Sequence, residues 1–179
     1  DSPNAAAGKR HFEGVTGKRP GGADGLVYSR FNGPNQEILE DRLAIWDEAE
    51  DALAFSSGMS AIATLFLAMT KPGDTIVHSG PLYAATETLI GRILGKFGVK
   101  WLDFPAGATR EEIDAVLTEA ATGNVALIYL ESPANPTNAL VDIEAVAASR
   151  DAIFADAAEK PPIAIDNTCL LYTSPSPRD

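Results

Sequence analysis

Four short polar segments of this chain each follow an apolar run, and their residue types could bind and activate a small ligand. A carboxylate, an amide, a phenol and a glycine-containing turn occur among them. If the apolar runs are parallel strands, all four segments lie at the carboxyl edge of one sheet, where α/β proteins bind ligands. The segments are residues 56–59, 80–83, 131–136 and 166–168.

Asp166 is the most suggestive single residue, because it directly follows the apolar run 161–165. A carboxylate at that position could pair with a ring nitrogen of a ligand and keep that nitrogen protonated. A protonated ring is a better electron sink. The alternative is that Asp166 caps a helix or forms a turn, which is the commoner fate of an aspartate after a strand.

The sequence Ser57-Gly58-Met59 stands between an expected strand and an expected helix. Gly58 permits a tight turn there, and the free amides of the next helix's first turn can bind an anion such as phosphate. The alternative is that the small residues only let the helix pack closely on the sheet. Neither Gly-x-Gly-x-x-Gly nor Gly-Lys-Ser/Thr occurs, which disfavours dinucleotides and nucleoside triphosphates as ligands.

Two further residues are placed to position a planar ligand. Tyr83 follows one expected strand and precedes a helix, so its ring could lie over the ligand; otherwise it fills a gap at the rim. Asn135 lies in the turn 131–136, whose two prolines fix the backbone and could hold its side chain inward as a hydrogen-bond donor. Ordinary Asx-turn chemistry is the alternative for Asn135.

Composition narrows the class of protein. The 179 residues carry 45% hydrophobic and 22% charged side chains, as in ordinary globular proteins. The net charge of −11 argues against nucleic acid as the main partner, since phosphate contacts need a basic surface. No apolar stretch reaches transmembrane length, so no membrane partner is expected. A cytoplasmic location is the default expectation.

Other catalytic classes find no support in the sequence. The single cysteine, Cys169, excludes a disulfide framework. His11 and His78 are scattered and give no metal-ligand spacing, so no metal site is expected. No Gly-x-Ser-x-Gly motif surrounds any serine, which disfavours a serine hydrolase.

The hydrophobic pattern predicts strands that alternate with helices, and therefore a mostly parallel sheet covered by helices on both faces. The first expected helix begins near residue 36, with Ile38, Leu39, Leu43 and Trp46 on its inner side. Thr109 and Glu112 have capping-box spacing at the start of another helix. Strands are expected at 52–55, 75–78, 99–104, 125–130 and 161–165, and helices at 59–69, 84–97, 109–121 and 142–158.

Three segments are expected along the chain. Residues 1–35 are an extended arm and loop, because residues 1–26 are rich in Gly, Pro, Lys and Ala and show no period. Residues 36–168 form an incomplete α/β domain. Residues 169–179 resemble the translation of a transposase-type sequencing adapter, so we expect a non-native tail that takes no part in the fold.

In this order, the polar segments resemble the Cys/Met-metabolism family of pyridoxal-phosphate enzymes, whose fold is aminotransferase-like (fold type I). That family includes cystathionine γ-synthase, cystathionine γ-lyase, methionine γ-lyase and the O-acetylhomoserine sulfhydrylases. The likeness covers residues 28–168. It combines Tyr-Ser-Arg at 28–30, Ala-Phe-Ser-Ser-Gly-Met at 54–59, Leu-Tyr at 82–83, Glu-Ser-Pro-Ala-Asn-Pro-Thr at 131–137 and Asp-Asn-Thr at 166–168.

The resemblance implies pyridoxal 5′-phosphate as cofactor and a role for each polar segment. Ser57, Gly58 and Met59 would bracket the phosphate, with amides of the latter two as donors. Tyr83 would stack on the pyridine ring and serve as a general acid/base near the leaving group. Asn135 would hydrogen-bond the ring hydroxyl oxygen, and Asp166 would pair with the ring nitrogen.

Three further residues and the assembly follow from the same resemblance. Glu131 would support the cluster. Tyr28 and Arg30 would reach the phosphate of a neighbouring subunit, so the site would need a dimer, normally within a tetramer. Arg30 has the planar cationic fork that suits phosphate. The expected reaction is γ-replacement or γ-elimination on a sulfur amino acid or O-acylhomoserine.

The chain also departs from the family pattern. The family's Schiff-base lysine, in a Ser-x-Thr-Lys setting, and its substrate-carboxylate arginine are missing, so we expect this chain by itself to be inactive. Two alternatives remain: another fold type I enzyme, such as a β-lyase or aminotransferase, and a non-catalytic α/β module for a phosphorylated ligand. The lysines present all stand in other contexts: Lys9, Lys18, Lys71, Lys96, Lys100 and Lys160.

Overall fold

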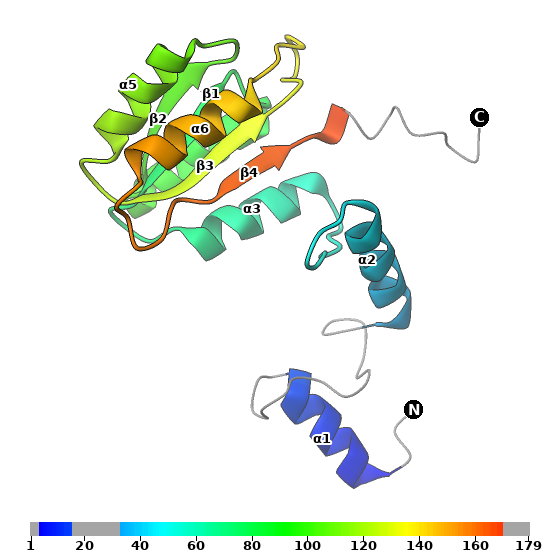
Figure 1. Cartoon of the computed structure of the whole chain (residues 1–179). Helices are drawn as coiled ribbons and strands as arrows, with labels where there is room; N and C mark the ends of the chain where they lie inside the picture. The colour runs from blue at the N-terminus through cyan, green and yellow to red at the C-terminus, as the bar shows by residue number, and fades with distance from the viewer. Residues whose placement is uncertain (1–3, 16–32, 170–179) are drawn as a thin grey trace, which may run out of the picture. The chain divides into compact units, whose positions relative to one another are not determined.

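The computed structural model describes residues 4–15 and 33–169, which fall into two units, Asp1–Ser57 and Gly58–Asp179. The second unit contains a four-stranded sheet in which every pairing is parallel (Figure 1). The strand order is β2-β1-β3-β4. The strands are β1 (Thr75–Gly80), β2 (Lys100–Pro105), β3 (Val125–Glu131) and β4 (Ile163–Asp166).

Helices cover both faces of this sheet, as the sequence pattern predicts. Successive residues of a strand point to opposite faces, so Val77 and Ile128 join one core while Ile76 and Leu127 join the other. Helices α5 (Arg110–Ala120) and α6 (Ile143–Ile153) pack on the first face. Helix α3 (Gly58–Met69) packs on the second, together with Ile90 and Leu94 from the turns that follow α4 (Ala84–Thr88).

The predicted helix start at Thr109 is confirmed. The Thr109 amide donates to Glu112 Oε2 at 2.8 Å, and the Glu112 amide donates to Thr109 Oγ1 at 3.3 Å. This reciprocal pair satisfies two amides that a helix start otherwise leaves without partners. Helix α6 is shorter than predicted: it ends at Ile153, whereas the sequence pattern predicted an end at residue 158.

The predicted helix 84–97 is not a single α-helix. After α4 the chain continues as a π-helical turn, Leu89–Ile93, and a 3₁₀ turn, Leu94–Phe97. Trp101 of β2 packs against this segment so closely that a Cβ at Gly95 would lie 3.1 Å from its ring. Gly98 has a φ of 81° and ends the segment.

The first unit corrects two predictions. Residues Ala5–Val15 form helix α1, where an extended arm was predicted. Asn4 Oδ1 accepts the Ala7 amide at 2.9 Å and so caps this alanine-rich helix. The predicted strand 52–55 does not form, and the described residues of its own unit contain no strand to pair with it. The Ala54 amide donates instead to Glu40 Oε1 at 2.7 Å.

Helix α2 (Pro34–Trp46) forms where predicted, but it buries no residue. Its expected inner side chains are exposed instead, and Trp46 is 73% exposed. No helix among the described residues is long and apolar enough to cross a membrane.

Candidate active site

The carboxyl edge of the sheet is held together by the buried side chain of Glu131, at the end of β3. Its Oε2 accepts the backbone amide of Tyr83 at 2.6 Å, and its Oε1 accepts that of Asn135 at 2.7 Å. The Glu131 amide donates to Ser79 Oγ of β1 at 3.1 Å. One carboxylate therefore fixes the two loops that carry the predicted stacking tyrosine and the predicted amide donor.

Asp166 ends β4 and lies next to Glu131, its Cα partner in the β3–β4 register. Its Oδ2 accepts the hydroxyl of Tyr129 at 3.2 Å. Its Oδ1 accepts both the amide and the hydroxyl of Thr168, at 3.1 and 2.6 Å. Each hydrogen bond that the described residues make to this carboxylate is donated to it, from an amide or a hydroxyl.

Tyr129 is buried in β3, and its ring stacks edge-on against Phe66 of α3, with centroids 5.0 Å apart. Burial raises the pKa of its phenol well above the ordinary value, and the negative charge of Asp166 raises it further. Tyr129 therefore stays protonated, and remains a hydrogen-bond donor to Asp166, at any pH at which an ordinary enzyme works.

An open cavity of about 310 Å³ lies between the start of α3 and the end of β4. Gly58 and Asp166 both line it, together with Tyr129. A Cβ built on Gly58 would meet nothing within 4 Å, so the first turn of α3 faces open space. The cavity thus joins a helix N-terminus, which favours anions, to a hydrogen-bonded carboxylate.

The remaining lining of this cavity is mostly apolar, as expected for a site that accepts an aromatic ring. It comprises Ala61, Ile62, Leu65, Ala164, Ile165, Asn167 and Thr168. Next to the start of α3, the buried Thr86 of α4 donates to the sulfur of Met59 at 3.8 Å. This contact links the first turn of α3 to the helix that follows Tyr83.

The structure therefore brings five predicted residues close together along one edge: Gly58, Tyr83, Glu131, Asn135 and Asp166. Tyr83 is 43% exposed and Asn135 is also exposed; neither of them lines the cavity that Gly58 and Asp166 share. Ser57 is the last residue of the first unit and is exposed. Tyr28 and Arg30 lie outside the described residues.

Sequence reasoning missed Tyr129, and it included Thr168 in the polar segment 166–168 without giving it a role of its own. Tyr129 was counted within an apolar strand, although a tyrosine in a buried strand needs a partner for its hydroxyl. This need for a hydrogen-bond partner was the feature of the sequence that could have indicated a role for Tyr129. Thr168 follows Asp166 by two residues, which is the spacing of an Asx turn.

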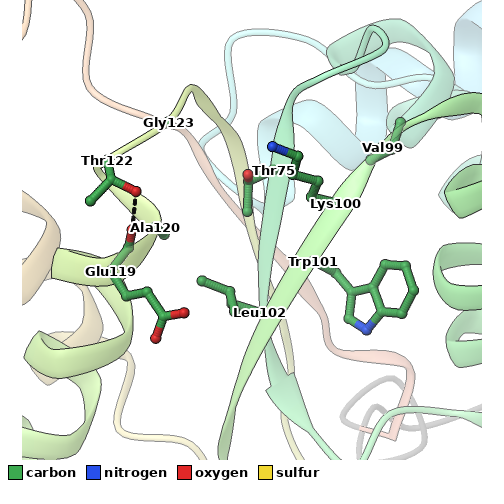
Figure 2. Close-up of a pocket in the computed structure, with 9 residues that line it drawn as sticks. All are labelled: Thr75, Val99, Lys100, Trp101, Leu102, Glu119, Ala120, Thr122 and Gly123. Carbon is green, nitrogen blue, oxygen red and sulfur yellow. Dashed lines mark hydrogen bonds between the residues drawn. The ribbon is translucent and has the colours of Figure 1, made fainter.

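A larger hollow of about 490 Å³ lies near the opposite end of the strands, where β1 and β2 begin and α5 ends. Figure 2 shows Leu102 on the side of β2 that faces Glu119, with Trp101 on the other side. None of the predicted site residues that the structure describes lines this hollow. No group of three or more metal-ligating side chains occurs in the part of the chain that the structure describes.

A parallel sheet with a helix N-terminus and a buttressed carboxylate at its carboxyl edge defines an α/β domain with a ligand site at that edge. The chain belongs to the family of Cys/Met metabolism PLP-dependent enzymes, and the model of this family matches residues 7–175. The cofactor of this family is pyridoxal 5′-phosphate, as predicted.

Individual relatives agree with this assignment. The chain is 39% identical to an L-methionine gamma-lyase of Pseudomonas deceptionensis over 72% of its own length and 31% of the relative's. It is 37% identical to an O-succinylhomoserine sulfhydrylase of Pseudomonas aeruginosa, over 71% and 30% respectively. The chain thus spans about a third of the length of the curated relatives it matches.

The structural comparison confirms the predicted aminotransferase-like fold. The crystal structure of metB from Corynebacterium glutamicum superposes with a TM-score of 0.70 at 32% identity. The match covers 83% of this chain and 36% of that one.

Proposed function

We propose that this chain is the cofactor-binding part of a longer pyridoxal-phosphate enzyme, which replaces or eliminates a group at the γ-carbon of a sulfur amino acid or O-acylhomoserine. The observation that carries the proposal is the shared cavity of Gly58 and Asp166. It offers anion-binding amides and a carboxylate to one ligand, and this pairing suits a phosphorylated pyridine.

The residues present fit the cofactor. The open space beside Gly58 leaves room for a phosphate at the first turn of α3, where the amides of Gly58 and Met59 would donate to it. Asp166 would accept the ring-nitrogen proton, and Asn135 would donate to the ring hydroxyl oxygen. When bound, the cofactor supplies an electron sink for negative charge that develops on the substrate.

The protein's own residues then hold and move protons around the ring. Asp166 would keep the ring nitrogen protonated. Tyr83, held through its amide by Glu131, would cover the ring and transfer a proton at the leaving group. Because Tyr83 is 43% exposed, a substrate can reach its hydroxyl.

We extend the proposal to the assembly. Tyr28 and Arg30 would bind the cofactor phosphate of a neighbouring subunit, so that the working enzyme is a dimer within a homotetramer in the cytoplasm. The cationic fork of Arg30 is chemically suited to that phosphate.

The test uses the intact protein that contains this chain. We expect it to bind pyridoxal 5′-phosphate and either to release an α-keto acid from methionine or to join sulfide to an O-acylhomoserine. Asp166→Ala should lower kcat by about 10²-fold or more, because the ring nitrogen loses the group that keeps it charged.

A matched control is Asp103→Ala, which removes an exposed carboxylate at the carboxyl end of β2. This variant should keep its activity. Full turnover by Asp166→Ala would contradict the proposal. An intact protein that binds the cofactor but acts only at the β-carbon, or only transfers amino groups, would replace γ-chemistry with one of the other fold type I reactions.

A further inference from the structure

The hydrogen bonds around Asp166 are unequally divided between its two oxygens. An ionised carboxylate has about four acceptor positions, two on each oxygen. The amide and hydroxyl of Thr168 both donate to Oδ1, whereas Tyr129 alone donates to Oδ2. Among the described residues, one acceptor position is therefore left over, and it is on Oδ2.

The donor to Oδ2 is rigidly held. Tyr129 is 2% exposed, and its ring lies edge-on to Phe66 at an interplanar angle of 76°. Tyr129 pairs with Ala164 in the β3–β4 register, so Asp166 stands two residues further along on the same face of the sheet. Backbone pairing and core packing together fix where the hydroxyl meets the carboxylate.

We infer that Tyr129 is a positioning residue for Asp166, and that Oδ2 is the oxygen that receives the ring nitrogen of the cofactor. The inference rests on the proposed function and deepens it. Thr168 donates to both acceptor positions of Oδ1, and Tyr129 donates to one of the two positions of Oδ2. These three bonds prevent the carboxylate from rotating, either toward solvent or into another orientation. A single open position then meets the ligand's N–H.

Two alternatives would leave Tyr129 without this role. The phenol could serve only to fill the core between β3 and α3, as its contact with Phe66 indicates. Alternatively, Thr168 alone could hold the carboxylate, with its two bonds to Oδ1. In either case the loss of the Tyr129 hydroxyl would not act through Asp166, and a double-mutant cycle measures that dependence directly.

The experiment uses the intact protein, freed of cofactor, and measures the Kd of pyridoxine 5′-phosphate by calorimetry. This ligand keeps the ring and phosphate but has no aldehyde, so it binds without a lysine. Tyr129→Phe keeps the aromatic ring and removes only the hydroxyl. It should weaken binding by about five- to tenfold in the wild-type background and by less than twofold beside Asp166→Asn.

Phe104→Leu is the matched control, because Phe104 is buried in the core on the other face of the sheet and does not hold Tyr129. Its effect on Kd should be the same in both backgrounds. Thr168→Val measures the part that Thr168 plays; its exposed side chain lies outside the core, and it removes the 2.6 Å bond to Oδ1. It should show the same dependence on Asp166.

The outcomes separate the two proposals. Equal effects of Tyr129→Phe in both backgrounds, or no effect in either, would overturn the positioning role while leaving the site intact. If Tyr129→Phe does not fold, 3-fluorotyrosine in place of Tyr129 is the second variant, because it keeps the ring and changes only the donor strength of the hydroxyl. Equal effects of that replacement in both backgrounds, or none in either, have the same meaning. An Asp166→Asn variant that binds as tightly as wild type would overturn the proposed function, and the role of Tyr129 with it.

Discussion

The carboxylate of Glu131 accepts the backbone amide of Tyr83 at 2.6 Å, although the two residues are 48 positions apart in the sequence. The same side chain accepts the Asn135 amide, so both of its oxygens are used on backbone donors. The buried Glu131 carboxylate therefore determines the geometry of the loops that carry Tyr83 and Asn135. Neither loop can move without breaking a charge-assisted hydrogen bond to it.

Glu131→Gln should therefore destabilise the protein and misplace one of the two loops. The glutamine amide has only one acceptor oxygen, and its NH₂ group would face the second backbone N–H. We expect a loss of about 1–3 kcal/mol in the free energy of unfolding, measured by urea denaturation. Turnover should fall as well, because Tyr83 is no longer held.

Glu144→Gln is the control for this variant, since Glu144 is exposed in the first turn of α6. It should change the free energy of unfolding by less than about 0.5 kcal/mol. If Glu131→Gln proves as stable and active as wild type, the two hydrogen bonds that Glu131 accepts from the Tyr83 and Asn135 amides are not needed for stability or activity.

Gly58→Ala should separate folding from cofactor binding. The new methyl group meets nothing within 4 Å, so the stability of the cofactor-free protein should be unchanged or slightly improved, since alanine favours the helix. If the phosphate occupies that space, the Kd for pyridoxal 5′-phosphate should rise about tenfold. Fluorescence titration and thermal unfolding report the two quantities separately.

Gly95→Ala is the opposite case and the natural comparison. A Cβ there would lie 3.1 Å from the ring of Trp101, so the substitution should lower stability by about 1–3 kcal/mol. It should leave cofactor affinity unchanged, because Trp101 lies on the edge strand β2, which contributes no residue to the cavity. Unchanged affinity in Gly58→Ala would argue against phosphate at the start of α3.

The sheet and much of the site edge were predictable from the sequence, because apolar runs and turn residues mark the strand ends. Asp166 and Asn135 could be assigned to a common edge by this reasoning alone. The hydrogen bond from the Tyr83 amide to Glu131 could not be predicted from the sequence. It joins residues 48 positions apart and depends on how β1 and β3 pair.

Other errors share one physical cause, which is that local sequence does not show what an element packs against. The predicted strand 52–55 has suitable residues, but its own unit contains no described strand with which it could pair. Helix α2 carries apolar side chains, but no described residue of its own unit buries them. In contrast, the capping box of Thr109 involves only neighbouring residues and was predicted in full.

Thr109→Ala tests the predicted capping box at the start of α5. It removes the side-chain acceptor for the Glu112 amide and should cost about 1 kcal/mol of stability. Cofactor affinity should not change, because Thr109 begins α5, on the face of the sheet opposite Tyr129. A loss of affinity without loss of stability would show that this face of the sheet communicates with the site.

The raised pKa of Tyr129 predicts how stability depends on alkaline pH. In the unfolded chain this phenol loses its proton near pH 10, whereas in the folded protein it keeps the proton. Above pH 10 the unfolded state therefore binds fewer protons than the native state, and the free energy of unfolding falls as pH rises. Below pH 10 both states are protonated, and Tyr129 contributes no pH dependence.

The expected slope from this single group is about −1.4 kcal/mol per pH unit above pH 10. Tyr129→Phe should remove that slope, so the wild-type and variant curves converge between pH 10 and 11. Phe66→Leu should lower stability at every pH while keeping the slope, because its phenol is intact. Urea denaturation at half-unit intervals from pH 8 to 11 measures both, and parallel curves for wild type and Tyr129→Phe would contradict the buried, protonated state of Tyr129.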